Sequence, residues 1–131
     1  MIAIDTNVLV RLVVADDPDQ TRRARKLFRR GGVLVTTTVL LEAAWVLSSA
    51  YERDRSRVSA ALRGVLGLDG VTCDAPAVVA QALEWFDKGA DFADALHVAS
   101  TAHASRFATF DRRLVQRARR AGVPRVEAVP R

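Results

Sequence analysis

Short apolar segments alternate with longer helical stretches along the whole chain. These segments, residues 1–4, 33–35, 71–73 and 107–109, are continuous apolar or β-branched runs, and residues 126–129 add a last edge strand. Continuous apolar runs of this length are typical of strands buried on both faces of a sheet. Strands that alternate with helices favour parallel pairing, with helices on both faces. We therefore expect an α/β fold, an α/β/α sandwich around a central, mostly parallel sheet of four or five strands.

Helix start and stop signals divide the remaining sequence. Asp17, Pro18 and Gln20 form a helix start with an N-cap, a first-turn proline and a capping-box partner, and Gly31-Gly32 ends that helix. The other expected helices lie at about residues 7–14, 37–51, 55–64, 76–88, 92–103 and 112–120. No repeat or linker separates them, so the 131 residues are expected to form one domain, residues 1–131.

Composition narrows the classes of protein to which the chain can belong. Half of the residues are hydrophobic and 27% are charged, which is globular composition. The single cysteine, Cys73, excludes an internal disulfide and suits a cytoplasmic location, and we expect neither a secretory signal nor a membrane span. A net charge of +5, carried almost wholly by arginine, suits an anionic partner such as nucleic acid.

Four carboxylates stand in apolar sequence, with few basic residues nearby. Asp5 and Asp111 directly follow expected strands or lie just beyond them, Glu42 lies within an apolar helix, and Asp94 lies in the first turn of another. Burying an ionised carboxylate without a partner costs several kcal/mol. Because ligands collect beyond the carboxyl ends of parallel strands, the four acids are expected to share one cleft and one cation. Mg²⁺ is the first candidate and Mn²⁺ the second, since both favour oxygen ligands.

The ordered motifs resemble the PIN domain family, and more narrowly its VapC toxins. The resemblance is carried by Ile4-Asp5-Thr6-Asn7, Glu42 in its apolar helix, the segment 90–96 around Asp94, and the segment 108–111 ending at Asp111, and it covers about residues 1–120. It implies a single PIN domain that acts as a Mg²⁺-dependent endoribonuclease toxin of a type II toxin–antitoxin system. It also implies an RNA substrate, a cognate VapB-type antitoxin as inhibitor, and a homodimer. Apolar helices near residues 39–47 or 76–86 are candidates for the dimer contact.

The resemblance assigns the family's four acids, in order, to Asp5, Glu42, Asp94 and Asp111. Asp5 and Asp94 are the expected direct metal ligands, assisted by Asp111, and Glu42 either binds a second ion or positions and deprotonates the attacking water. The auxiliary residues are Thr6, Asn7, Asp91 and Thr109. At the start of the last helix, Arg112 and Arg113 are expected to hold the RNA backbone.

Each acid also has a structural interpretation. Asp5, Asp91 and Asp111 suit the N-cap positions of the helices that follow them. For Glu42 the alternative is a buried salt bridge to Arg11 or Arg106. The basic stretch from Arg22 to Arg30 is interpreted as a solvated face. The alternative functions are a PIN-like nuclease of RNA maturation or DNA-structure cleavage without an antitoxin, and a non-catalytic binding module.

Overall fold

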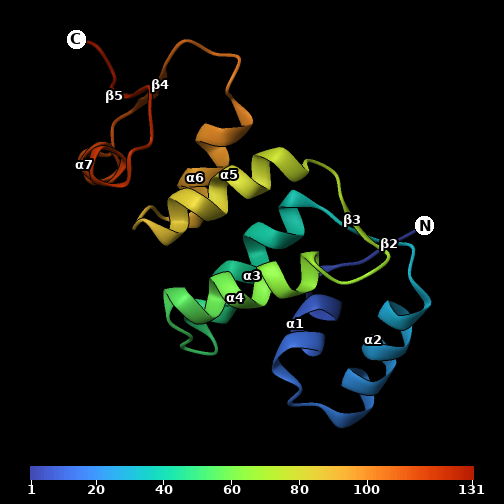
Figure 1. Cartoon of the computed structure of the whole chain (residues 1–131). Coiled ribbons are helices and arrows are strands. Elements are labelled where there is room, and N and C mark those ends of the chain that lie inside the picture. Colours follow the sequence, from blue (N-terminus) through green and yellow to red (C-terminus); the bar gives the residue numbers. More distant parts are fainter. The chain divides into compact units, whose positions relative to one another are not determined.

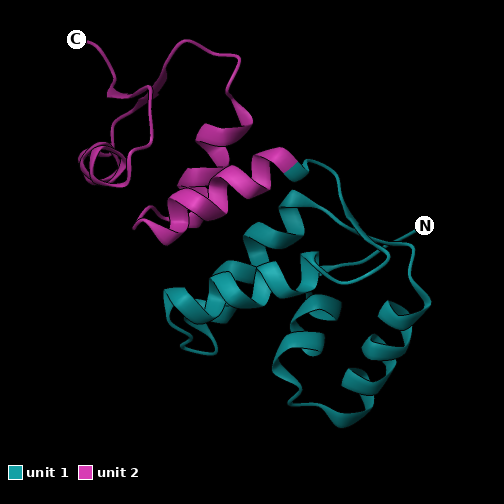
Figure 2. Cartoon of the chain, viewed as in Figure 1, with its two compact units in different colours: residues 1–76 teal, residues 77–131 magenta.

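The computed structural model describes all 131 residues. The chain forms two compact units, residues 1–76 and 77–131, shown in teal and magenta in Figure 2. Seven helices and five short strands alternate along the chain (Figure 1). No helix is long and apolar enough to cross a membrane. Each unit is described by itself below.

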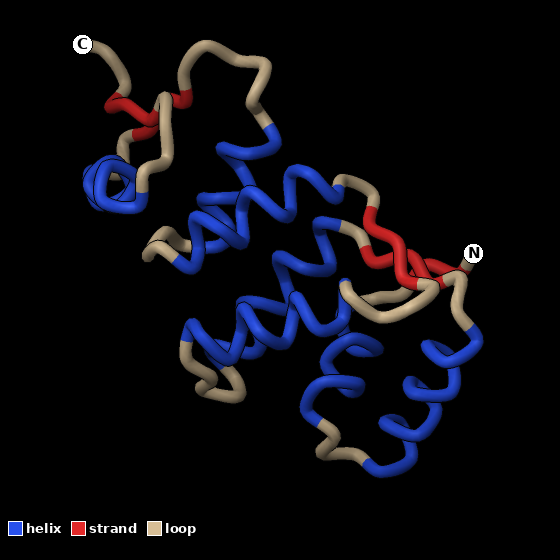
Figure 3. The backbone as a smooth tube through the Cα atoms, in the orientation of Figure 1, coloured by secondary structure: helices blue, strands red, loops and turns tan.

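The first unit contains a three-stranded parallel sheet with β2 in the centre. Its strands are β1 (Ile2–Ala3), β2 (Val33–Val35) and β3 (Val71–Cys73), drawn in red in Figure 3. The helices between them are α1 (Thr6–Val14), α2 (Pro18–Arg30), α3 (Thr37–Ser49) and α4 (Arg55–Leu66). β2 pairs with a strand on each side, and its Val33 and Val35 are completely inaccessible, whereas Leu34 is half-buried.

Local capping explains where the helices of this unit begin. The carboxylates of Asp17 and Asp54 accept hydrogen bonds from the backbone N–H groups three residues on, and the Thr36 hydroxyl does the same for Val39. α2 ends at Gly31, whose φ of +75° is readily adopted only by glycine. α1 packs against both α2 and α3, and its buried Leu9 and Val10 contribute to the core.

The second unit contains α5 (Pro76–Asp87, whose first residue closes the first unit), α6 (Phe92–Ser100), α7 (Arg112–Ala121) and a two-stranded parallel sheet. In that sheet β4 (Phe107–Thr109) pairs with β5 (Val126–Ala128). Phe86 and Phe92 pack edge to face with ring centroids 5.6 Å apart, which joins the end of α5 to the start of α6. Gly122 ends α7 with a φ of +74°.

The fold class expected from the sequence is confirmed, with all five strand positions correct and every pairing parallel. The strands pair as three plus two, one sheet in each unit. The prediction that the first strand is buried is wrong: Ile2 is 52% exposed because β1 lies at the edge of its sheet. α6 is also shorter than predicted, since Thr101 leaves helical geometry and residues 101–105 form turns.

Candidate functional site

Asp5 and Glu42 line the same hollow of the first unit. Asp5 follows β1 and caps α1, with its Oδ1 accepting a hydrogen bond from the N–H of Val8 at 3.2 Å. Its second carboxylate oxygen forms no hydrogen bond within the protein. Thr6, Asn7, Thr38 and Val39 complete the lining of this cavity of about 300 Å³. The predicted meeting of a strand-end acid with the acid of α3 is therefore present in this unit.

Glu42 is exposed and forms no hydrogen bond or ion pair. The prediction of a buried carboxylate is wrong here, because one face of α3 is open: Trp45, one turn further along α3, is 67% exposed. The alternative salt bridge to Arg11 is absent as well, since Arg11 pairs with Asp16 at 2.7 Å; Arg106 belongs to the second unit, where it pairs with Glu127 at 3.3 Å. An unpaired carboxylate that lines a cavity with a second carboxylate is a candidate cation ligand.

Asp91, Asp94 and Asp111 form the acidic group of the second unit. Asp91 caps α6 by accepting a hydrogen bond from the N–H of Asp94 at 3.1 Å. Asp111 caps α7 by accepting from the N–H groups of Arg113 and Leu114. The capping interpretations of Asp5, Asp91 and Asp111 are thus confirmed. Each cap uses one carboxylate oxygen, which leaves the other oxygen free for a ligand.

Asp94 is the one member of this group that is half-buried, and its carboxylate forms no hydrogen bond. Burial raises the pKa of Asp94 above its ordinary value, and the charges of Asp91 and Asp111 raise it further. His97 and Arg117 lower it in part, and burial remains the largest cause of the shift. The carboxylate of Asp94 is therefore close enough to those of Asp91 and Asp111 to be repelled by each, and a cation bound at Asp94 would offset that repulsion. Asp5 and Asp111, in contrast, are exposed, so the prediction of buried acids holds only in part for Asp94.

The predicted auxiliary residues have different surroundings. Thr6 is buried at the start of α1, whereas Asn7 is exposed and lines the hollow beside Asp5. The hydroxyl of Thr109 accepts a hydrogen bond from the N–H of Asp111 at 2.9 Å. That bond fixes the turn between β4 and α7, and with it the position of the Asp111 carboxylate.

Arg112 and Arg113 open α7, directly after Asp111. Both are exposed and form no side-chain hydrogen bond or ion pair, so their guanidinium groups are available to an anion. α7 buries Leu114, Ala118 and Ala121 and leaves its arginines in solvent. This amphipathic arrangement presents a positive surface beside a candidate carboxylate ligand.

The donor set suits a hard divalent cation, although neither unit by itself gathers three or more His, Cys, Asp or Glu side chains into a group that could hold a metal ion. The available donors are carboxylate oxygens, of which Asp5 and Glu42 belong to the first unit and Asp94 and Asp111 to the second. Their oxygens are exposed or half-buried, which fits Mg²⁺, an ion that keeps several of its waters.

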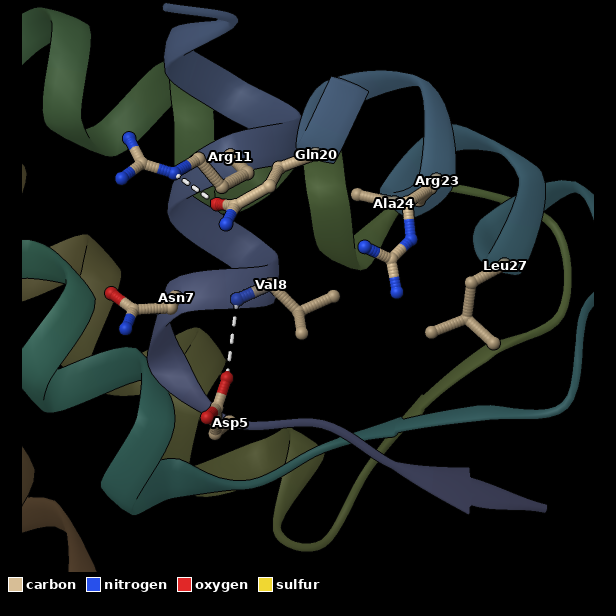
Figure 4. Close-up of a pocket in the computed structure, with 8 residues that line it drawn as sticks. All are labelled: Asp5, Asn7, Val8, Arg11, Gln20, Arg23, Ala24 and Leu27. Carbon is tan, nitrogen blue, oxygen red and sulfur yellow. Dashed lines mark hydrogen bonds between the residues drawn. The ribbon is translucent and has the colours of Figure 1, made fainter. Parts of the chain in front are cut away.

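Three residues near these acids were missed in the sequence analysis. Thr38 precedes Glu42 by four residues, and this helical spacing could have placed it beside Glu42 in the cavity. Gln20, predicted to close a capping box, instead accepts a hydrogen bond from Arg11 Nε at 2.8 Å, as Figure 4 shows. The guanidinium of Arg125 donates three hydrogen bonds to backbone carbonyls at the end of α6, the helix that contains Asp94, and in the turn after it. No local sequence signal marks the contact of Arg11 with Gln20 or those of Arg125 with α6 and the turn after it.

Comparison with known families gave one match. The model of the PIN domain matches residues 2–120, a range that runs through both compact units and contains all four acids. Neither the comparison with curated proteins nor the comparison with solved structures gave a significant match.

Proposed function

Because the chain belongs to the PIN domain family, whose members are generally nucleases that bind RNA, we propose that it is a Mg²⁺-dependent endoribonuclease. The observation that carries the proposal is that the four acids have carboxylate oxygens available to a cation. Asp5 and Glu42 line one cavity, Asp94 is repelled by two neighbouring carboxylates, and each of these acids has at least one oxygen without a protein partner. We propose that both units act together as a single PIN domain, so that the acids of both serve one site.

In this proposal the residues of the chain divide the work of phosphodiester hydrolysis. Asp5 and Asp94 hold the metal, Asp111 assists them, and Glu42 orients the attacking water and accepts its proton. When bound, Mg²⁺ (or Mn²⁺) lowers the pKa of water and neutralises charge on the reacting phosphate. Thr109 and the helix caps keep the carboxylates in position, and Asn7 orients substrate or carboxylate oxygens. Arg112 and Arg113 hold the RNA backbone.

We propose that the cellular role is that of a VapC-like toxin of a type II toxin–antitoxin system, inhibited by a VapB-type antitoxin. Support comes from the order of the motifs and from the family match over residues 2–120. A cytoplasmic homodimer is part of this proposal. Trp45 supports it, because a 67% exposed tryptophan on α3 is suited to a contact between subunits.

Expression in a bacterial host tests the toxin role. Wild-type protein should arrest growth, and co-expression of the small protein encoded by the neighbouring reading frame should relieve the arrest. Asp5→Asn should be harmless, because asparagine keeps the cap of α1 and removes the charged ligand. Normal growth with well-expressed wild-type protein rules out a toxin. Purified protein should also cleave RNA in the presence of Mg²⁺ or Mn²⁺, and EDTA should stop the cleavage. Undiminished cleavage in EDTA rules out metal-dependent hydrolysis.

A further inference from the structure

A second hollow lies on the other side of Asp5, between α1 and α2 (Figure 4). It has a volume of about 430 Å³, within the range of about 300–1,000 Å³ typical of small-ligand sites. Its lining comes from both helices: Asp5, Asn7, Val8, Arg11, Gln20, Arg23, Ala24 and Leu27. Asp5 and Asn7 also line the cavity that contains Glu42, so the two hollows adjoin at the candidate metal ligand.

The lining of this α1–α2 pocket combines apolar walls with a few polar groups. Val8, Ala24 and Leu27 supply the apolar surface, and the amide nitrogen of Gln20, whose oxygen accepts a hydrogen bond from Arg11, offers a donor. A flat heterocycle with polar edges needs both kinds of surface, and single-stranded RNA presents such rings when its bases are unstacked. A phosphate is a poorer occupant, because the carboxylate of Asp5 repels an anion that enters without a cation.

Arg23 is the cation of the pocket that can reach a ligand. Arg11 is engaged by Gln20, Asp16 and Tyr51, with its Nη1 only 2.7 Å from Asp16 Oδ1. The side chain of Arg23 extends from α2 into the space between the helices in Figure 4, and its ion pair with Asp19 is long, at 3.6 Å. A guanidinium plane in this position can stack on a base.

We propose that the α1–α2 pocket binds the base of a nucleotide next to the scissile phosphate of single-stranded RNA, with Arg23 stacked on the base and Leu27, one turn further along the same helix, packed against the edge of the base. The ligand class rests on the nuclease function proposed above. The reacting phosphate then lies on the Glu42 side of Asp5 and the neighbouring base on the α2 side. Arg23 and Leu27 become specificity-determining residues, which contribute base preference in addition to backbone attraction.

Arg22 provides a matched control for Arg23. Both side chains form an ion pair with Asp19, and their exposed fractions are 72% and 73%. Arg22 lines a different hollow of α2, together with Arg25 and Arg29. Replacing either arginine with alanine removes the same charge from the same helix, but only Arg23→Ala alters the α1–α2 pocket.

The experiment measures binding of fluorescent RNA homopolymers of equal length by anisotropy, in EDTA, alongside an abasic oligomer. Wild-type protein should prefer one base. Arg23→Ala should weaken binding of the preferred homopolymer on the order of tenfold, since base stacking on a side chain contributes about 1–3 kcal/mol, and should leave the abasic oligomer unchanged. Arg22→Ala should change all oligomers by the same small factor. Leu27→Ala, which alters no charge, should also reduce the base preference, with circular dichroism as the check on folding.

The inference is overturned if wild-type protein shows no base preference, if folded Leu27→Ala retains it, or if Arg23→Ala weakens the abasic oligomer as much as the homopolymers. That last result assigns Arg23 to the phosphate backbone. Hydrolysis of the same oligomers with Mg²⁺ separates the two proposals. If wild-type protein cleaves RNA and neither variant changes its base preference, the pocket proposal alone is refuted. If the variants lose the base preference in binding but wild-type protein cleaves no RNA, the nuclease proposal alone is refuted.

Discussion

Arg125 is expected to make a large contribution to the stability of the second unit. Its guanidinium donates hydrogen bonds to three carbonyls at and beyond the end of α6: Thr101 at 3.1 Å, Ala104 at 2.9 Å and Val98 at 3.2 Å. The Val98 carbonyl also accepts from the N–H of Thr101, and the Thr101 carbonyl from the N–H of Ala104, so Arg125 is a second donor to both. A cation at a helix C-terminus also interacts favourably with the helix dipole. Arg125→Ala removes all three bonds.

The expected loss is about 2–3 kcal/mol. Hydrogen bonds to a charged donor contribute about 1.5–3 kcal/mol each when buried, but these share one half-buried guanidinium, and water can reach the carbonyls once it is gone. The backbone of Arg125 has a φ of +67°, a left-handed conformation that is strained for any residue with a Cβ. Arg125→Gly relieves that strain, so it should be about 1 kcal/mol more stable than Arg125→Ala.

Urea unfolding followed by circular dichroism measures both differences. Arg120→Ala is the control, because it removes one exposed arginine of α7 that has no partner, and it should change stability by less than about 0.5 kcal/mol. If Arg125→Ala is as stable as this control, the three hydrogen bonds do not hold α6. If the glycine and alanine variants unfold at the same urea concentration, the argument from backbone strain is wrong.

Three further predictions concern the acids and the basic helix. Asp94→Asn should stabilise the protein in EDTA at neutral pH, because the folded state raises the pKa of Asp94 and so disfavours its charged form. In urea unfolding, the stability advantage of the variant over wild type should shrink as pH falls through that raised pKa towards 3.8. A stability advantage that persists at low pH contradicts this cause. Asp5→Ala should be about 1 kcal/mol less stable to unfolding than Asp5→Asn, since only asparagine keeps the hydrogen bond from the N–H of Val8. Neither variant should cleave RNA. Full ribonuclease activity of Asp5→Asn would mean that Asp5 serves only as a helix cap. Replacing Arg112 and Arg113 with alanine should lower the salt dependence of RNA affinity, with a slope smaller by about 1.4 for a single strand, and an unchanged slope removes α7 from the RNA site.

The sequence was sufficient to predict the strands and most helix ends because those depend on local chemistry. Asp17 and Asp54 cap their helices as predicted, and Gly31 and Gly122 end theirs in conformations that favour glycine. Apolar continuity marked the strands because β-branched residues favour extended backbone. The same patterns could not predict how the strands divide between sheets, since pairing depends on contacts between distant segments.

Burial of the acids was the main error. Glu42 has apolar neighbours in the sequence, but they lie on other faces of α3, and Glu42 shares an open face with Trp45. Apolar residues nearly all round a helix predict burial all round, but one face of α3 is exposed. The contacts of Arg11 with Tyr51 and of Arg125 with Val98 join positions far apart in the chain, so no local motif predicts them.

The central proposal is that acids of both units take part in a shared metal site. Electron paramagnetic resonance of Mn²⁺ titrated into the protein tests it most directly, with wild type compared with Asp5→Asn from the first unit and Asp94→Asn from the second. Glu84→Gln is the control, because Glu84 is an exposed acid paired with Lys88. Each of the two aspartate variants should weaken Mn²⁺ binding at least about tenfold, and the control should not change it. If either aspartate variant binds Mn²⁺ as tightly as wild type, the acids of the two units do not share a metal.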